Sequence, residues 1–216
     1  MPPGHHGREW DSHKDAGLSI ENYFHQLSGL IPQLPYNTIA RIASVFFDAC
    51  TEQRTVFVFG NGGSAASASH MMCDMNKGVS ELDGSKRPQF MALTDNVALM
   101  SAWANDFGYE RIFSEQLKTF VKSRDVAFAI STSGDSPNVL LALETAREQG
   151  ALTVGLAGCQ GGQMKSLCDI CAVVPSDNVQ VIEDLHQAML HSIFTAVRES
   201  LFAGNAKAVL AKAASF

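Results

Sequence analysis

The stretch Thr55-Val-Phe-Val-Phe-Gly-Asn-Gly-Gly-Ser64 decides the fold of this chain. Residues 55–60 form a short apolar run rich in β-branched and aromatic side chains, which predicts a buried strand. The glycine turn at 60–64 ends this strand, and residues 65–77 favour a helix that closes at Gly78. A strand, a glycine turn and a helix in this order are typical of an α/β domain.

The same alternation continues along the chain on both sides of this stretch. Further strands are predicted at 89–93, 125–130, 151–156 and 170–175. Helices are predicted at 19–34, after Asn37, at 97–120, at 136–150, after Gly162 and over a last segment lined by Ile182, Leu185, Met189, Ile193, Val197 and Leu201. This order predicts an open parallel sheet covered by helices on both faces.

Length and composition favour one compact domain. The chain has 216 residues, of which 46% are hydrophobic and 18% charged. We expect a flexible N-terminal tail at 1–16, a single domain at 17–203 that includes the N-terminal helices, and a C-terminal tail at 204–216.

Charge and hydropathy exclude two classes of partner. Sixteen Lys and Arg face 22 Asp and Glu, so the formal net charge of -6 argues against nucleic-acid binding. No apolar run is long enough for a membrane span and the first residues lack the apolar core of a signal peptide, so we expect a cytoplasmic protein without membrane contact.

The cysteines predict no disulfide framework. Their number is odd, and they lie in apolar segments, which favours reduced, buried thiols. Cys168 and Cys171 form a C-x-x-C pair, but the second pair that a structural zinc needs is missing.

Two polar turns predict an anion site at one edge of the sheet. Ligands of parallel sheets bind beyond the carboxyl ends of the strands, and the turn at 60–64 can point backbone amides at an anion. The run Ser131-Thr-Ser-Gly-Asp-Ser136 places four hydroxyls just before a helix that begins with Pro137, which favours a phosphate monoester. The alternative is a serine-rich turn in which Ser136 only caps its helix.

Titratable side chains cluster on two of the predicted helices. His70 and Asp74 are spaced i, i+4 and share a face. The last helix carries the others, at Glu183, Asp184, His186 and His191. Each is compatible with an ordinary surface or core-edge position, whereas together, near a phosphate turn, they point to metal binding or proton transfer.

Several motifs together resemble a known family. They are Gly-Asn-Gly-Gly-Ser at 60–64, His70, Asp95, Ala-Asn-Asp at 104–106, the serine turn at 131–136 and Ile182-Glu183-x-x-His186-x-x-x-x-His191. Over residues 20 to 200 the chain is similar to sugar isomerase (SIS) domains of the phosphoheptose isomerase group. The resemblance implies a three-layer α/β sandwich with an open five-stranded parallel sheet of flavodoxin-like, nucleotide-binding-type topology, and a homotetramer or dimer.

The resemblance also implies an activity and a set of site residues. The activity is aldose-ketose isomerisation of a phosphorylated sugar, sedoheptulose 7-phosphate, through an enediol. The implied sugar-phosphate residues are Asn61, Gly62, Gly63, Ser64, Thr94, Asp95, Ser131, Thr132, Ser133, Ser136 and Glu183. The implied ligands of one zinc ion per subunit are His70, Asp74, Glu183 and His191, and the implied proton carriers are Asp74 and His191.

The chain departs from the family pattern at three positions. Asp74 and Glu183 stand where the family has glutamate and glutamine, and Asp135 replaces an asparagine in the serine turn. The shorter arm of Asp74 changes its reach toward a carbon-bound proton, and Glu183 makes the site more anionic. We expect the Asp135 carboxylate to face solvent or to cap a backbone amide, because it would otherwise repel a phosphate dianion.

Helical spacing constrains the implied metal site. Glu183 and His191 are eight residues apart, which is about 12 Å along one straight helix. We therefore expect either an extended backbone at Glu183 or a site shared across a subunit interface.

Two functions remain open from the sequence. The first is the isomerase. The second is a non-catalytic phosphosugar-binding SIS protein that acts as a regulator or assembly factor.

Overall fold

A parallel sheet forms the centre of the molecule. The structure is a computed structural model that describes residues 12–79 and 87–213. Within these residues the strands are β1 (Thr55–Gly60), β2 (Gln89–Ala92), β3 (Val126–Ser131), β4 (Leu152–Ala157) and β5 (Ile170–Val173). All pair in parallel in the order β2-β1-β3-β4-β5, which is the flavodoxin-like order. The predicted fold class is confirmed.

Helices follow the strands as the sequence pattern predicts. The bounds are α1 (Ser12–Leu30), α2 (Tyr36–Thr51), α3 (Gly63–Gly78), α4 (Val97–Phe107), α5 (Ser114–Phe120), α6 (Pro137–Glu148), α7 (Met164–Leu167) and α8 (Val179–Ala213), with short 3-10 turns η1 (Ile31–Gln33) and η2 (Tyr109–Arg111). Within the described ranges, none of these helices combines the length and apolar character that crossing a bilayer requires.

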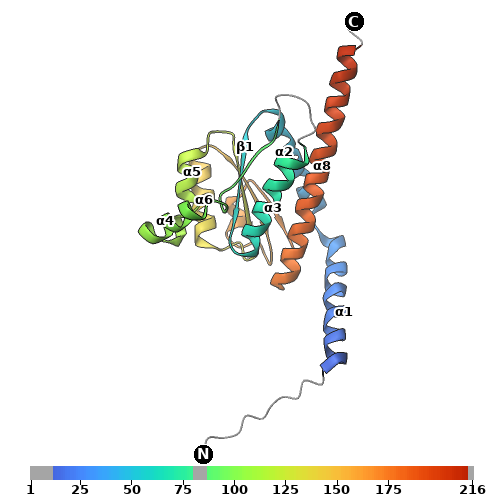
Figure 1. Ribbon diagram of the computed structural model, residues 1–216. Coiled ribbons are helices and arrows are strands. Elements are labelled where there is room, and N and C mark those ends of the chain that lie inside the picture. Colours follow the sequence, from blue (N-terminus) through green and yellow to red (C-terminus); the bar gives the residue numbers. More distant parts are fainter. Residues whose placement is uncertain (1–11, 80–86, 214–216) are drawn as a thin grey trace, which may run out of the picture.

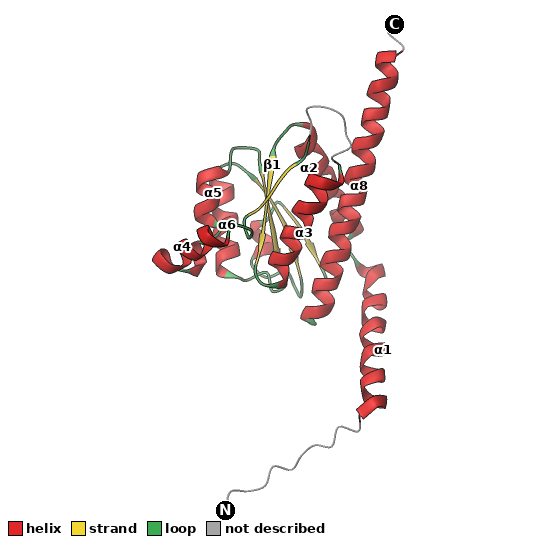
Figure 2. Cartoon of the chain, in the orientation of Figure 1, coloured by secondary structure: helices red, strands yellow, loops and turns green. Residues whose placement is uncertain are grey.

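The sheet separates two hydrophobic cores, because successive residues of a strand point to opposite faces. Val56 and Val58 of β1 join α2, α3 and α8 on one face. Phe57 and Phe59 join α5 and α6 on the other face. Figures 1 and 2 show the resulting three layers, with α3 and α8 on one side of the sheet and α5 and α6 on the other.

An aromatic cluster fills the core under α2. The ring of Phe46 is fully buried, and its centroid lies 5.3 Å from that of Phe90 and 5.0 Å from that of Phe128, both at edge-to-face angles. Phe90 lies on β2 and Phe128 on β3, so this contact holds α2 against two strands that flank β1.

One predicted helix is divided in the structure. The prediction of a continuous helix over 97–120 is wrong, because α4 ends at Phe107, η2 follows and α5 begins at Ser114. Gly108 stands at the break with φ of 100°, a conformation that a side chain disfavours. Every residue of α4 keeps exposed surface, and α4 projects from the body in Figure 1.

Both ends of the described chain are helical. Helix α1 begins at Ser12, inside the range predicted as a tail, and α8 continues to Ala213, beyond the predicted domain end at residue 203. Both helices extend past the sheet in Figure 1. Residues 1–11 and 214–216 lie outside the described residues, so the division into one domain and two tails stays a prediction.

All five cysteines lie in the described residues and are free thiols. The expectation that they are all buried is wrong for Cys73 and Cys159, which are exposed. Burial raises the pKa of Cys50 to about 12. Cys168 and Cys171 lie together against Gly155, where a Cβ would be only 2.9 Å and 3.3 Å from the two sulfurs.

Truncation of Phe46 tests the aromatic cluster. Phe46→Ala removes a fully buried ring and leaves a cavity, so we expect the free energy of unfolding to fall by about 3–5 kcal/mol in urea titrations. Phe120→Ala, at a position 44% exposed, is the control and should cost less than about 1 kcal/mol. Equal losses in the two variants would contradict the assigned core.

Candidate active site

The polar turns meet at one edge of the sheet. Strand β1 lies between β2 and β3, and the carboxyl ends of parallel strands share an edge, so the turns after these strands are neighbours. The chain passes from β1 to β2 on one side and then returns past β1 to β3 on the other side. This reversal is the position at which open α/β sheets bind ligands.

The glycine turn is tied to the start of α6 by two asparagines. Asn61 Nδ2 donates to Asn138 Oδ1 at 2.9 Å, and Asn138 Nδ2 donates back to Asn61 Oδ1 at 2.8 Å. The Tyr109 hydroxyl donates to the same Asn61 oxygen at 3.1 Å. Asn138 is buried, and the sequence analysis missed it because only the folded chain brings it to residue 61. Gly62, with φ of 53°, then leads into α3 at Gly63, and Ser64 is buried in its first turn.

The serine turn is preorganised by its own hydroxyls. Ser131 is buried, and its Oγ accepts a hydrogen bond from Gly134 N at 3.2 Å and lies 3.4 Å from Ser136 Oγ. The Ser133 hydroxyl accepts from Asp135 N at 3.2 Å. Ser136 precedes α6 but its side chain makes no capping hydrogen bond to residues 137–148, all of which are described. The alternative of a turn that only caps its helix therefore lacks its defining contact.

Asp135 caps a backbone amide, as expected. Its Oδ1 accepts from Gln163 N at 2.9 Å, at the start of α7, so a backbone amide stabilises its charge. The same turn contacts the chain after β4 directly. Gly134 has φ of 71°, and a side chain there would collide with Gly161 O. Thr132 O accepts from Gly158 N at 3.0 Å, which adds a second contact between these loops.

The third turn is joined to α3. Thr94 Oγ1 donates to Asp95 Oδ1 at 3.2 Å, and the Ser69 hydroxyl of α3 donates to the same oxygen. Thr94 also lines a pocket of about 340 Å³ with Val97, Met100, Ser101, Ala104 and Tyr109. Asp95 is exposed at this edge and is available to a ligand.

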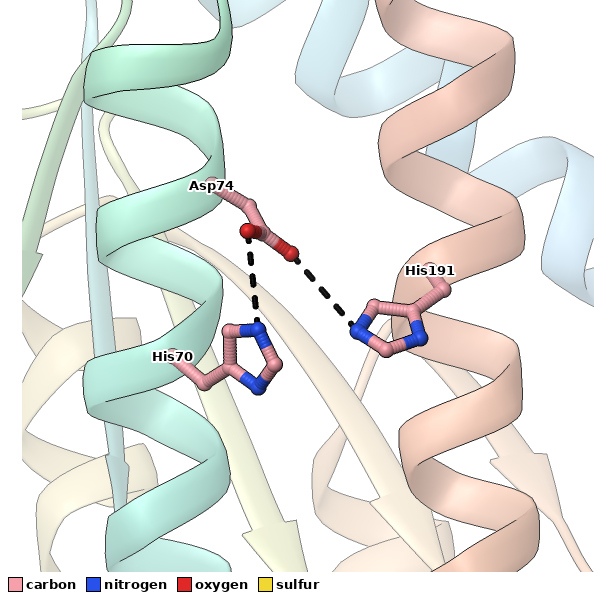
Figure 3. Close-up of side chains that lie close together, drawn as sticks. All are labelled: His70, Asp74 and His191. Carbon is pink, nitrogen blue, oxygen red and sulfur yellow. Dashed lines mark ion pairs between the residues drawn. The ribbon is translucent and has the colours of Figure 1, made fainter.

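Three titratable side chains meet between α3 and α8. His70 Nε2 lies 3.5 Å from Asp74 Oδ1, and His191 Nε2 lies 3.8 Å from Asp74 Oδ2. The two imidazole centroids are 5.0 Å apart. Figure 3 shows the three side chains pointing toward one another from the two helices. Each offers a ligand atom, and these atoms all lie within 4.8 Å of one another.

Gln187 is a fourth member that the sequence analysis missed. Its Nε2 lies 3.1 Å from His70 Nδ1 and 2.9 Å from His191 Nε2. The signal was present in the sequence, because Gln187 precedes His191 by four residues and therefore shares its face of α8.

Glu183 lies apart from this cluster. Helix α8 begins at Val179, so Glu183 is helical and the expected extended backbone at this residue is wrong. Its carboxylate lies beside Gly63, where a Cβ would come within 2.6 Å of Oε1. This places a carboxylate at the start of α3, near the glycine turn. Its role as a metal ligand and the site shared across a subunit interface stay predictions.

The side chains of Asp184 and His186 have partners outside this cluster. Asp184 accepts a hydrogen bond from the Tyr23 hydroxyl of α1 at 2.7 Å, which raises the pKa of Tyr23 to about 12. His186 is buried, and its Nε2 lies 3.0 Å from Ala157 O at the end of β4. Burial lowers the pKa of His186 to about 4, so the ring is neutral and donates to this carbonyl.

The residues between α3 and α8 fit a divalent metal ion. Two imidazoles and one carboxylate are a donor set that zinc uses in sites with an open position. All three side chains keep solvent access, at exposed fractions of 47%, 25% and 50% for His70, Asp74 and His191. A cation and a substrate oxygen can therefore both reach them.

Comparison with known proteins gives the family. Residues 22–158 match the SIS domain family. A phosphoheptose isomerase of Geobacter sp. (strain M21) is 40% identical over 164 residues, which are 76% of this chain and 84% of that protein. The phosphoheptose isomerase of Rhodospirillum rubrum is 39% identical over 167 residues, which are 76% of this chain and 86% of that protein.

Solved structures agree with the sequence relatives. A phosphoheptose isomerase from Francisella tularensis matches with a TM-score of 0.78 at 28% identity and covers 85% of this chain and 98% of that one. The enzyme from Neisseria gonorrhoeae matches with the same TM-score of 0.78 at 23% identity, which supports the fold. The chain belongs to the SIS domain family. Within this class its relatives place it among the phosphoheptose isomerases, which are enzymes.

Removal of Asn138 tests the link between the turns. Asn138→Ala leaves Asn61 Nδ2 without this acceptor and leaves Asn61 Oδ1 with the Tyr109 hydroxyl, so we expect the free energy of unfolding to fall by about 1–3 kcal/mol in urea titrations. Asn37→Ala, at an exposed position on α2, is the matched control and should change stability by less than about 0.5 kcal/mol. A variant as stable as the control would show that the asparagine pair contributes nothing.

Acid should destabilise the fold through His186. The unfolded ring takes up a proton near its ordinary pKa of 6.5, whereas the folded ring does so only near 4, so stability falls as the pH drops from 6.5 to 4. Between pH 7 and pH 4 we expect the natural chain to lose about 3 kcal/mol more than His186→Gln, in which no ring titrates. Urea unfolding at the two pH values measures this difference, and equal losses would exclude a buried neutral ring.

Proposed function

We propose that this chain converts sedoheptulose 7-phosphate into the corresponding aldose, a heptose 7-phosphate, through an enediol. The observation that carries the proposal is the pairing of two sites on one helix. Helix α3 begins in the glycine turn and carries His70 seven residues after Gly63, about 10 Å along its axis. A seven-carbon sugar phosphate can bridge this span, with its phosphate at the turns and its carbonyl end at the cluster.

Phosphate binding supplies the orientation. The sites for it are the amides of the turn at Asn61, Gly62 and Gly63 and the hydroxyls of Ser131, Thr132, Ser133 and Ser136. We assign Thr94, Asp95 and Glu183 as acceptors of hydrogen bonds from sugar hydroxyls, since all three keep exposed surface. Binding energy gained at the phosphate then holds C1 and C2 beside the groups that move protons.

Proton transfer is assigned to two residues of the cluster. Asp74 removes the proton from C1 of the ketose, and the electron pair of the broken C–H bond forms the C1–C2 double bond of the enediol as the C2 oxygen gains a proton. His191 serves the oxygens: the C1 hydroxyl then loses its proton and becomes the carbonyl, while the electron pair of the C1–C2 double bond takes up a proton at C2 to give the aldose. His191 Nε2 faces Asp74 while Nδ1 faces away, so the ring can exchange protons within the site through Nε2 while no cation occupies this nitrogen.

A zinc ion held by His70, Asp74 and His191 would polarise the carbonyl oxygen and stabilise negative charge that develops on it. The same proposal includes Glu183 of a second copy as a further ligand. The helix keeps Glu183 away from the cluster of its own chain. We also propose a homotetramer, or a dimer, in the cytoplasm. Exposed apolar residues of α1, such as Ile20 and Phe24, support self-association.

The non-catalytic alternative has less support. A binding protein needs the phosphate turns but has no use for two imidazoles and a carboxylate that share one point in space. SIS domains of transcription factors, such as the RpiR protein of Sphaerobacter thermophilus, match this chain with a TM-score of 0.60 at 17% identity, which shows a common fold alone.

Turnover of sedoheptulose 7-phosphate tests the proposal. The purified full chain with Zn²⁺ should form heptose 7-phosphate and exchange a substrate carbon-bound proton into heavy water. His191→Ala should lower kcat about 10²–10⁴-fold because a group that moves protons is lost.

The control is His25→Ala, which removes an exposed histidine of α1 and should leave kcat/KM within about twofold. Circular dichroism and the thermal midpoint verify that both variants fold. Tight sugar-phosphate binding without proton exchange would favour the regulator, and full activity of His191→Ala would remove this residue from the mechanism.

A further inference from the structure

The side-chain amide of Gln187 lies between the two imidazoles of the cluster. Its nitrogen is 3.1 Å from His70 Nδ1 and 2.9 Å from His191 Nε2. We infer that Gln187 is a positioning residue for the metal site, whose amide selects the ring nitrogen that His70 offers to the cation. The inference rests on the metal site of the proposed function and concerns a residue that contacts the ligands without being one of them.

The contacts define the proton positions in the metal-free site. An amide NH₂ group is a donor only, so His70 Nδ1 and His191 Nε2 are both acceptors. His70 then carries its proton on Nε2, which faces the Asp74 carboxylate at 3.5 Å. Either orientation of the amide leaves one imidazole lone pair beside Asp74, that of His191 at 3.8 Å in this orientation and that of His70 at 3.5 Å in the opposite one. Charge favours the orientation in which the amide nitrogen faces the rings, because the proton then lies in the closer of the two carboxylate contacts.

A cation reverses this arrangement at His70. The nitrogens nearest the Asp74 oxygens are Nε2 of both rings, so a cation among the three side chains takes the lone pairs of these two atoms. His70 must then hold its proton on Nδ1, the atom that faces Gln187. Rotation of the amide by half a turn brings Oε1 to this place, where it accepts the proton. Metal-bound histidines usually donate their second nitrogen to such an acceptor.

Glutamine suits this position because it carries a donor and an acceptor at the same point. Gln187 is half-buried on α8, one turn before His191, so its side chain reaches both rings without movement of the backbone. A glutamate here could only accept, which favours the metal-bound arrangement. A leucine could do neither.

Zinc affinity without substrate is the first test. Zn²⁺ is titrated into the full chain against a chromogenic chelator for the natural protein, Gln187→Leu and Gln187→Glu. We expect Gln187→Leu to bind about 10–100-fold more weakly because His70 loses its acceptor, and Gln187→Glu to bind more tightly than the natural protein. Gln187→Met takes the place of the leucine variant if that variant does not fold.

Gln180→Glu is the matched control, since it adds the same charge to an exposed position of the same helix. It should leave zinc affinity within about twofold. The inference is overturned if Gln187→Leu binds as the natural protein does, if Gln187→Glu binds more weakly, or if Gln180→Glu gains as much as Gln187→Glu.

The tautomer of His70 is the second test. Nitrogen-15 NMR at a pH where the rings are neutral should show the proton on Nε2 without metal and on Nδ1 with Zn²⁺. A proton on Nδ1 in the metal-free protein overturns the inference. Neither readout uses a sugar. If the protein is inactive but shows the expected zinc affinities, the proposed function is wrong and this inference holds. If the protein is active but its zinc affinity does not depend on Gln187, this inference is wrong and the proposed function holds.

Discussion

Strand β1 pairs in parallel with β2 along one edge and with β3 along the other, and every polar turn of the site takes its position from this pairing. Parallel strands are joined by crossover connections, so the carboxyl ends of the three strands lie at the same end of the sheet, and each is followed by a turn and a helix. The glycine turn, the Thr94 turn and the serine turn are thereby gathered from three separate segments. Hydrogen bonds that involve these turns, such as those between Asn61 and Asn138, then fix the positions of segments that the sheet already holds close together.

Helix α8 connects the two halves of the site. It carries Gln187 and His191 at the cluster, Glu183 beside the glycine turn and His186 toward the sheet. The neutral imidazole of His186 donates to the carbonyl of Ala157, the last residue of β4, and the following residue, Gly158, donates to Thr132 of the serine turn. A short chain of hydrogen bonds therefore runs from α8 through the end of β4 to the proposed phosphate turn.

The sequence was a good guide where local pattern and burial agree, and a poor one where contacts depend on the finished fold. Buried parallel strands are continuous apolar runs, so 55–60 and 125–130 could be found directly. Apolar periodicity continues across Gly108, and this concealed the break between α4 and α5. The pairing of His70 with Asp74 follows from helical spacing, but the approach of His191 requires α3 and α8 to pack together. Asn138 acts through a partner far away in sequence, and no local signal distinguishes it from an ordinary polar residue, whereas Gln187 is marked only by its spacing of four residues from His191.

The stretch of α3 between Gly63 and His70 sets a fixed distance between the glycine turn and the His70 side of the site. It is a regular helix packed between β1 and α8, so the separation of its two ends is set by helical rise and does not adapt as a loop would. In the proposed function, a sugar phosphate too short to span this distance leaves one end of the site empty, and a longer one has to bend. Insertion of a single residue in this stretch would swing the His70 ring about 100° around the axis and away from α8. In the proposed function, the length of the sugar phosphate and the position of the metal ligand His70 therefore both depend on the same two turns of helix.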